Sequence, residues 1–327
     1  MKSKEKIKKE LIIRNYQEGD EYGILDLFKD SFNKKMNISF WKWRYANNPW
    51  DNEMISLAIH KNKIIGHYAV CPVAIKVLEN IEMGALSMTT MTHPNYRGMG
   101  IFPLLAKNIY DICRKKDYFL IYGFPNEMSY EGFVQKLGWV GAGKMKIYQF
   151  ESQDIDLNNS KNHEINEIKG KVPECSLFDK NKLKSDFSII RDEKYYNWRF
   201  INSPSKKRYS LYFIEENNKI RGIFVLKVFN NGNERIGHII DWFIEDSLYF
   251  EAIINFSKNF FFKKNIPKFS LWAMENQASR YNLKLLSKST HMMESTYFGY
   301  KILSQKIPSK KLDYKNFYIC MGDSDVF

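Results

Sequence analysis

The sequence predicts an α/β protein made of two copies of one unit, each a mixed twisted sheet with helices on both faces. Two observations carry this prediction. One phrase occurs twice, as "FWKWRYANNP" from residue 40 and as "YYNWRFINSP" from residue 195. Strand-like and helix-like runs then follow each phrase in the same order, which is typical of a duplicated unit of this length rather than a solenoid.

The repeat extends along both halves of the chain. The aligned pairs are Trp43 with Trp198, Arg44 with Arg199, Pro49 with Pro204, Gly66 with Gly222 and Asn126 with Asn276. Residues 151–186 break the pattern, because they are rich in Asn, Lys, Asp and Glu and show little periodicity. We therefore expect a first domain over residues 1–150, a connector over 151–186 and a second domain over 187–327.

The elements of the first copy follow from its residue patterns. Ser39 is the expected N-cap of a short helix that ends before Pro49. In chain order, the pattern predicts a helix over 18–32, this short helix, two strands within 54–70, strands over 71–80 and 83–92, a helix over 101–116, a strand over 118–124, a helix from Asn126 and a strand over 144–150.

Composition narrows the class of protein. The chain has 327 residues and 44% hydrophobic content, and its longest apolar runs are too short to span a membrane. The basic N-terminus lacks the apolar stretch of a secretory signal. The cysteines lack metal-like or disulfide-like spacing and are Cys71, Cys113, Cys175 and Cys320. We expect a cytoplasmic protein without a metal site; the pattern does not specify an oligomeric state.

The net charge of +13 favours anionic partners, either nucleic acid or an anionic cofactor or substrate. A dispersed, solvated basic surface explains the charge equally well.

The segment "THPNYRGMGIF", residues 92–102, is the most informative part of the sequence. It places Gly98 and Gly100 between a predicted strand and a predicted helix. Glycine lets the backbone approach a ligand, and the free N–H groups of a helix start bind anions, so the arrangement suits a pyrophosphate. It is neither a P-loop nor a dinucleotide fingerprint. An ordinary glycine turn is the alternative.

The wider context resembles the GNAT superfamily of acyl-CoA-dependent N-acyltransferases over residues 11–150. The segment Arg97-Gly98-Met99-Gly100-Ile101 matches the acyl-CoA motif of that family, whereas Phe102 stands where Gly or Ala is usual. A second signature, Asn near a helix start and Gly-aromatic after the helix, is matched by Asn126 and Gly138-Trp139.

This resemblance implies a set of acyl-CoA contacts. Backbone N–H groups should hold the pyrophosphate, and the strand 90–92 should splay from its neighbour and pair with the pantetheine arm. The implied cofactor-binding residues are Met91, Thr92, Arg97, Gly98, Met99, Gly100, Ile101, Phe102 and Asn126. The acceptor amine should attack the thioester directly in a ternary complex, without a cysteine nucleophile.

The catalytic residues are expected near this segment. Tyr130 is the nearest phenol to the position from which the family protonates the leaving thiolate; otherwise it packs. His93 is a candidate base, or else a loop imidazole. Thr90 and Thr92 are candidates for a water relay.

Acceptor contacts are expected from Arg44, Asp323 and Asp325. Because Arg199 repeats Arg44 in the second copy, a scaffold role is the alternative for Arg44. For the two aspartates the alternative is a solvated acidic tail. The second copy lacks an Arg-Gly-x-Gly segment and has Glu245, Asp246 and Glu251 near its helix start instead, so we expect one acyl-CoA per chain.

The layout looks like that of bacterial enzymes that acylate nucleotide-linked amino sugars for surface polysaccharides. The sequence therefore predicts an N-acyltransferase that acts on such a sugar. One alternative keeps the fold and changes the acceptor to an amino acid, an antibiotic or a protein amine. Another is a non-catalytic module that binds nucleic acid through its lysines.

Overall fold

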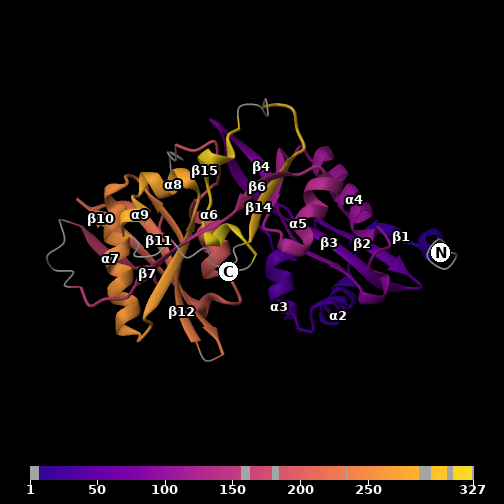
Figure 1. Cartoon of the computed structure of the whole chain (residues 1–327), viewed down its shortest axis with the longest axis horizontal. Helices are drawn as coiled ribbons and strands as arrows, with labels where there is room; N and C mark the ends of the chain where they lie inside the picture. Colours follow the sequence, from indigo (N-terminus) through magenta and orange to yellow (C-terminus); the bar gives the residue numbers. More distant parts are fainter. Residues whose placement is uncertain are drawn as a thin grey trace. The chain divides into compact units, whose positions relative to one another are not determined.

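The chain forms two compact units (Figure 1). The computed structural model describes residues 7–155, 163–178, 184–232, 234–286, 296–307 and 312–325. The first unit comprises Met1–Ala74, Ile81–Gly143 and Tyr297–Ser309, and the second comprises Ile75–Asn80, Lys144–Thr296 and Lys310–Phe327. The chain thus passes from one unit to the other five times, whereas the predicted domains of residues 1–150 and 187–327 follow each other without exchange.

The first unit is built on a mixed sheet with the order β1-β2-β3-β4-β5-β14-β6. Among the described neighbours in this order, β4 and β5 run parallel, and β1–β2, β2–β3 and β5–β14 are antiparallel. The strands are β1 (Ile12–Asn15), β2 (Ile55–His60), β3 (Lys63–Val77), β4 (Asn80–Thr92), β5 (Leu120–Gly123), β14 (Tyr297–Ile302) and β6 (Val140–Lys144).

Helices lie on both sides of this sheet, α2 and α3 on one side and α4 and α5 on the other (Figure 1). They are α2 (Asp20–Phe32), α3 (Ile38–Trp41), α4 (Ile101–Lys115) and α5 (Glu127–Glu131). The buried face of α4 includes Ile101, Leu105 and Ile109, at helical spacing. A Cβ on Gly66 of β3 would come within 2.9 Å of Ile101, so glycine allows α4 to pack closely on the sheet.

Two local predictions are wrong. Asn37, not Ser39, is the N-cap of α3, because its side chain accepts the Ser39 N–H at 2.8 Å. Residues 71–77 are not a separate strand but the end of β3. Pro72 does not interrupt β3, since it lies between the ladder with β2, which reaches Ala69, and the ladder with β9, which begins at Ile75.

The second unit has a sheet of corresponding order, β8-β10-β11-β12-β13-β7, with β12 and β13 parallel. Its strands are β8 (Glu164–Glu167), β10 (Tyr209–Glu216), β11 (Lys219–Asn231), β12 (Glu234–Ile244), β13 (Lys268–Ala273) and β7 (Lys146–Glu151). The strand β9 (Phe187–Ile189) pairs with β15 (Phe317–Tyr318). Strand β8 lies within the range predicted as a connector.

The helices of the second unit are α6 (Glu193–Tyr196), α7 (Leu248–Lys263), α8 (Glu275–Arg280) and α9 (Leu283–Leu286). The repeated phrase has one local structure in both units, a short α-helix that continues as a π-helical turn, Lys42–Ala46 in one copy and Asn197–Ile201 in the other. Met274, not Asn276, stands at the N-cap of α8, the position that Asn126 has in α5, so the predicted alignment at that point is displaced by two residues.

Each sheet receives one strand from the other half of the chain. Strand β14 lies beside β5 in the first unit, and β7 lies beside β13 in the second. Each imported strand runs antiparallel to the last strand of the parallel pair, and the two units therefore repeat the same topology through a reciprocal exchange.

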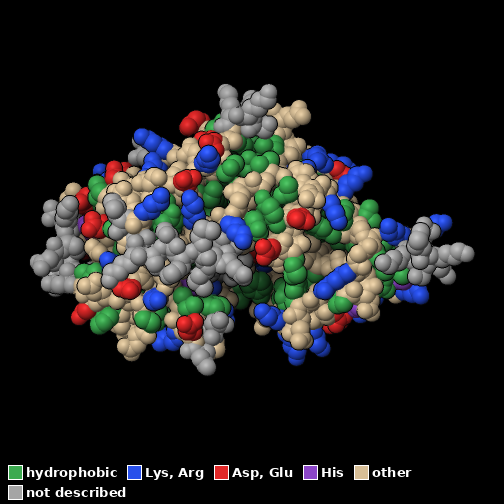
Figure 2. Space-filling model, in the orientation of Figure 1, with side chains coloured by type: hydrophobic (Ala, Val, Ile, Leu, Met, Phe, Trp, Pro, Cys, Tyr) green, Lys and Arg blue, Asp and Glu red, His purple; other side chains and the backbone are tan. Residues whose placement is uncertain are grey.

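No helix in the described ranges is both long enough and apolar enough to cross a membrane. On the face drawn in Figure 2, lysine and arginine side chains are scattered among apolar and acidic ones.

Candidate active site

The loop between β4 and α4 has a backbone that only glycine adopts easily. Gly98 has φ 73° and Gly100 has φ 74°, both in the left-handed region. A Cβ on either residue would meet no atom within 4 Å. Both glycines are exposed, while Met99 between them is buried and fixes the loop to the core. The loop therefore presents bare backbone to open space.

The start of α4 faces the same space. Gly100 is the N-cap and has no side chain with which to cap the helix. Among the described residues, no side chain accepts from the N–H groups of Ile101 and Phe102, and Pro103 has no N–H. Free N–H groups and the helix dipole both favour an anion at this point. The residues present thus fit the pyrophosphate of a CoA molecule.

Side chains of the loop secure its ends. Arg97 donates from Nε to the Thr92 carbonyl and from a terminal nitrogen to the Ser31 carbonyl, both at 3.3 Å. The Tyr96 hydroxyl lies 2.9 Å from Nδ1 of His60. The guanidinium of Arg97 is therefore occupied by backbone carbonyls of β4 and α2, which leaves the backbone of the loop to meet the ligand.

His93 is also part of the loop structure. Its Nδ1 accepts the Asn95 N–H at 3.2 Å, and its Nε2 lies 3.5 Å from an Asp30 carboxylate oxygen. The lone pair that a general base needs is therefore engaged, and the predicted role of His93 as a base requires that this bond breaks first.

Strand β4 extends beyond the end of β5, its parallel neighbour. The ladder between β4 and β5 runs from Gly84–Leu120 to Ser87–Gly123, where β5 ends, and β4 continues to Thr92. Met91 is buried, while Thr90 and Thr92 are half-buried. The backbone of residues 90–92 thus lies beyond the described ladder, as expected of a strand that pairs with a ligand.

Asn126 lies in the loop after β5 and begins α5. Its Oδ1 accepts the Ser129 N–H at 3.0 Å and the Ser129 hydroxyl at 2.9 Å. The side chain is exposed, and these bonds hold the amide nitrogen in a fixed direction. A contact with the pantetheine arm remains a prediction.

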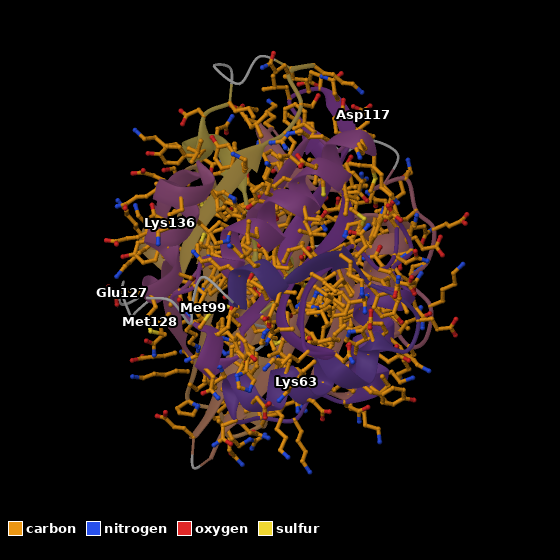
Figure 3. All side chains as sticks on the ribbon, turned by 90° about the vertical axis from the view of Figure 1, so that its right-hand side faces the viewer. Lys63, Met99, Asp117, Glu127, Met128 and Lys136 are labelled. Atoms are coloured by element: carbon orange, nitrogen blue, oxygen red, sulfur yellow. The ribbon has the colours of Figure 1, made fainter. Side chains whose placement is uncertain are left out.

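Phe102 is directed away from the N–H groups of the loop. Its ring lies 5.0 Å from that of Phe133 and 5.8 Å from that of Tyr68, centroid to centroid. It thus joins the start of α4 to the helix that follows β5, and in Figure 3 Met99 and the pair Glu127 and Met128 are drawn at the same edge of the unit. The bulky side chain leaves the anion site open.

Tyr130 packs against the edge of the sheet, at β14. Its ring stacks on Tyr297 of β14, with centroids 4.0 Å apart, and its hydroxyl lies so close to Gly141 that a Cβ there would come within 2.0 Å. The packing role is thus well supported, and the acid role of Tyr130 stays a prediction.

Arg44 is buried, with its guanidinium carbon 4.5 Å from the Trp43 ring centroid. Its counterpart Arg199 is buried as well and donates to the Gly322 carbonyl at 3.1 Å. The shared burial supports the scaffold interpretation, and a contact of Arg44 with an acceptor stays a prediction.

The C-terminal segment is not a solvated tail, and that prediction is wrong. Residues 321–324 are buried in the second unit. Both oxygens of Asp323 accept from Arg191, at 2.9 and 2.8 Å, and one of them also accepts the Cys320 N–H at 2.8 Å. Asp323 therefore has a structural place beside Asp241, which pairs with the same arginine. Asp325 is half-buried.

The helix start in the second unit differs from that of α4. Asp246, the residue before the N-cap Ser247, accepts the Leu248 N–H at 2.9 Å, so a carboxylate of the chain already lies at the start of α7. Glu245 pairs with Arg221 at 2.7 Å. An anion would meet like charge at this position.

Three residues near the site were not predicted from the sequence. Thr89 has φ 50° within β4, and it contacts Tyr45 and His67. For Tyr45 and His67, the signal that could have found them was the difference between the copies, since Phe200 and Ile223 occupy the corresponding positions of the second copy, at offsets of 155 (200 − 45) and 156 (223 − 67).

The sequence of the first unit matches a family model described as an acetyltransferase (GNAT) domain, over residues 12–141. The matched segment covers 130 of the 327 residues (141 − 12 + 1). A search of curated protein sequences gives no match. Within the described residues, no group of three or more His, Cys, Asp or Glu side chains is placed to hold a metal ion.

Solved structures of acyltransferases share the fold of most of this chain. A GCN5-related N-acetyltransferase from Anabaena variabilis is 13% identical with a TM-score of 0.67, and the alignment covers 90% of this chain and 73% of that one. A probable N-acyltransferase from Enterococcus faecalis is 12% identical with a TM-score of 0.65, over 90% and 72%.

A third structure is Saccharomyces cerevisiae N-myristoyltransferase with bound myristoyl-CoA. It is 10% identical with a TM-score of 0.60, over 90% of this chain and 78% of that one. At these identities the likeness concerns the fold, and it agrees with the predicted tandem GNAT folds.

Proposed function

We propose that this chain is an N-acyltransferase whose first unit transfers an acyl group from acyl-CoA to the amine of a nucleotide-linked amino sugar. The observation that carries the proposal is the uncapped start of α4 behind Gly98 and Gly100, next to the free end of β4. A helix start that favours an anion and a strand end without a β5 partner suit the pyrophosphate and the pantetheine of a CoA molecule, in that order. That the yeast relative binds myristoyl-CoA supports an acyl-CoA donor.

The reaction is a direct transfer. The neutral amine nitrogen attacks the thioester carbonyl carbon, negative charge develops on the carbonyl oxygen, and the C–S bond then breaks. The amine loses one proton to a base or to water held by Thr90 or Thr92, and the thiolate takes up one proton from Tyr130 or from solvent. Because no covalent enzyme intermediate forms, catalysis depends on position and on stabilisation of the oxyanion.

The identity of the acceptor is the more specific part of the proposal. A nucleotide-linked amino sugar is anionic and suits a chain with a net charge of +13. Arg44 and Asp325 remain candidate contacts, whereas Asp323 would first have to leave Arg191. An amino acid, an antibiotic or a protein amine would use the same acyl-CoA site.

The test is to offer acetyl-CoA and longer acyl-CoAs with a panel of nucleotide-linked amino sugars and to follow thiol release. We expect release that depends on one member of the panel. Release with free amino acids, aminoglycosides or lysine peptides, but with no nucleotide sugar, would move the activity to the alternative acceptors.

Absence of release with every acceptor, together with tight and salt-sensitive binding of arbitrary DNA, would support the non-catalytic alternative instead.

A further inference from the structure

Thr89 has a backbone conformation that is rare for its side chain. It is β-branched and lies within strand β4, yet its φ of 50° is in the left-handed region. A β-branched residue persists there only when its surroundings hold it.

Two hydrogen bonds hold Thr89 from different elements of the first unit. The Tyr45 hydroxyl, on the π-helical turn of the repeated phrase, donates to the Thr89 hydroxyl at 2.7 Å. Nδ1 of His67, on β3, lies 2.7 Å from the Thr89 carbonyl oxygen. Since a carbonyl only accepts, Nδ1 carries the proton. The side chain of Thr89 is thus held by one donor and its backbone by another.

The His67 ring is committed to this contact. It is fully buried, and burial lowers its pKa to about 4, so the ring is neutral at physiological pH. Its Nε2 has no hydrogen-bond partner within the described part of the chain. A buried histidine with a single bond, made to the strained residue, is placed for that bond.

The position of Thr89 along β4 shows why the two contacts matter for the strand segment that follows it. The last described pair with β5 is Ser87–Gly123, and the segment assigned to the ligand begins at Thr90. Thr89 therefore lies at the point where β4 leaves its partner. Its φ sets the direction in which the N–H and carbonyl groups of residues 90–92 point.

The second copy serves as an internal comparison. It keeps the scaffold residues Trp198 and Arg199 but has Phe200 in place of Tyr45 and Ile223 in place of His67. All of β12 is described, and none of its non-glycine residues has a positive φ. Both donors and the left-handed residue are therefore present in the copy with the glycine loop and missing from the other.

We propose that Tyr45 and His67 are positioning residues that hold Thr89 in its left-handed conformation and so direct the backbone of residues 90–92 toward the thioester of acyl-CoA. The proposal rests on the proposed function. Charge develops on the thioester oxygen during the transfer, and N–H groups stabilise it only if they already point at it.

The central experiment is a double-mutant cycle between position 45 and position 89. Tyr45→Phe removes one donor, and we expect kcat to fall about 10-fold while the Kd of CoA stays within about 2-fold, since the glycine loop is unchanged. Thr89→Gly adopts a positive φ without a donor. In that background Tyr45→Phe should change kcat by less than about 2-fold.

The matched control is Tyr118→Phe. Tyr118 is as buried as Tyr45, and its hydroxyl donates to Asp51 at 3.1 Å, away from Thr89. The same atom is deleted from the same unit, and kcat should stay within about 2-fold of wild type. His67→Asn, which retains an N–H donor, should retain more activity than His67→Leu.

A second measurement does not need activity. Amide hydrogen exchange in the peptide that covers residues 88–93 should rise in Tyr45→Phe and not in Tyr118→Phe. Wild-type kcat and exchange in Tyr45→Phe would overturn the proposal, as would equal losses from Tyr45→Phe in both backgrounds. If Tyr45→Phe does not fold, the two His67 variants decide the question by the same readouts. A wild-type chain that neither binds CoA nor turns over would instead remove the proposed function, while the exchange measurement still tests the hold on Thr89.

Discussion

At Gly100, the backbone conformation and the space beside it have different consequences for any side chain introduced there. The φ of 74° disfavours any L-residue, and the open space admits one sterically. Strain and loss of the anion site would therefore follow from the same substitution, and a test must separate them.

We predict that Gly100→Glu lowers the affinity for CoA by about 100-fold or more, since a carboxylate would stand where the pyrophosphate binds. Isothermal titration measures this. Gly19→Glu is the matched control, because Gly19 is also a left-handed N-cap whose Cβ, if it had one, would meet no atom within 4 Å, but it begins α2. Equal losses of CoA affinity in both variants would contradict the assignment of the loop.

The substitution Tyr130→Phe tests whether the Tyr130 hydroxyl is the acid that protonates the leaving thiolate. If the phenol protonates the thiolate, kcat should fall about 10-fold or more with little change in either substrate's Kd. Because the ring stack on Tyr297 survives the substitution, stability should hold. A full-rate variant would assign the proton to solvent and leave Tyr130 as a packing residue.

The buried His67 gives stability a pH dependence. Its pKa is lowered from the usual 6.5 to about 4 by burial, so the unfolded chain binds a proton that the folded chain excludes between those values. Stability present above pH 6.5 is therefore lost as the pH falls toward 4, by about 2 kcal/mol at pH 5. Denaturant unfolding at pH 7 and pH 5 should show a smaller loss in His67→Asn than in wild type, and an equal loss would show that His67 does not titrate.

Among the elements, the contrast between α4 and α7 is the clearest. Each helix follows the first strand of the parallel pair in its sheet, yet glycines precede α4, whereas the Asp246 carboxylate accepts the first N–H of α7. A fold that repeats therefore does not imply a site that repeats.

We predict that each chain binds one CoA. Isothermal titration of the intact chain should saturate at about one ligand per chain, and Gly100→Glu should abolish that event. Two equivalent events, or one that survives Gly100→Glu, would mean that the start of α7 binds CoA despite its carboxylates.

The sequence predicts those elements whose signals are local. The helix α4 follows from its apolar spacing, and the conformation of Gly98 and Gly100 follows from their place between strand and helix. The left-handed φ of Thr89 was not predictable, since it opposes the preference of a β-branched residue and the two side chains bonded to Thr89 come from other elements. The continuity of β3 through Pro72 also depends on which strands pair beside it, and residue patterns carry no record of that.

For the whole molecule, the exchange of β7 and β14 is the feature that residue patterns could not supply. A strand with a buried face fits either sheet equally well by its own pattern, and only long-range pairing decides its place. The predicted cut at residue 150 therefore separates segments that share a sheet.

We predict that a fragment of residues 1–150 does not fold cooperatively. It would lack β14, which pairs with β5, and the buried Phe298 that lies 5.4 Å from the Phe124 ring. Adding residues 296–309 to residues 1–143 through a flexible linker should restore a cooperative unfolding transition. A cooperative transition in the shorter fragment would show that β14 is dispensable.

The imported strand also sets an order of events during protein synthesis. The ribosome has made the earlier segments of the first unit once it reaches Gly143. The sheet of this unit can be completed only after Ile302 is made, which is 159 residues later (302 − 143). At roughly 5–20 residues per second, the ribosome needs about 8–30 s to make that stretch. During this interval β5 has an unpaired edge, and such edges are where nascent chains associate wrongly. A chaperone that covers the nascent first unit, rather than one that acts on the released chain, is thus the kind of assistance that this topology calls for.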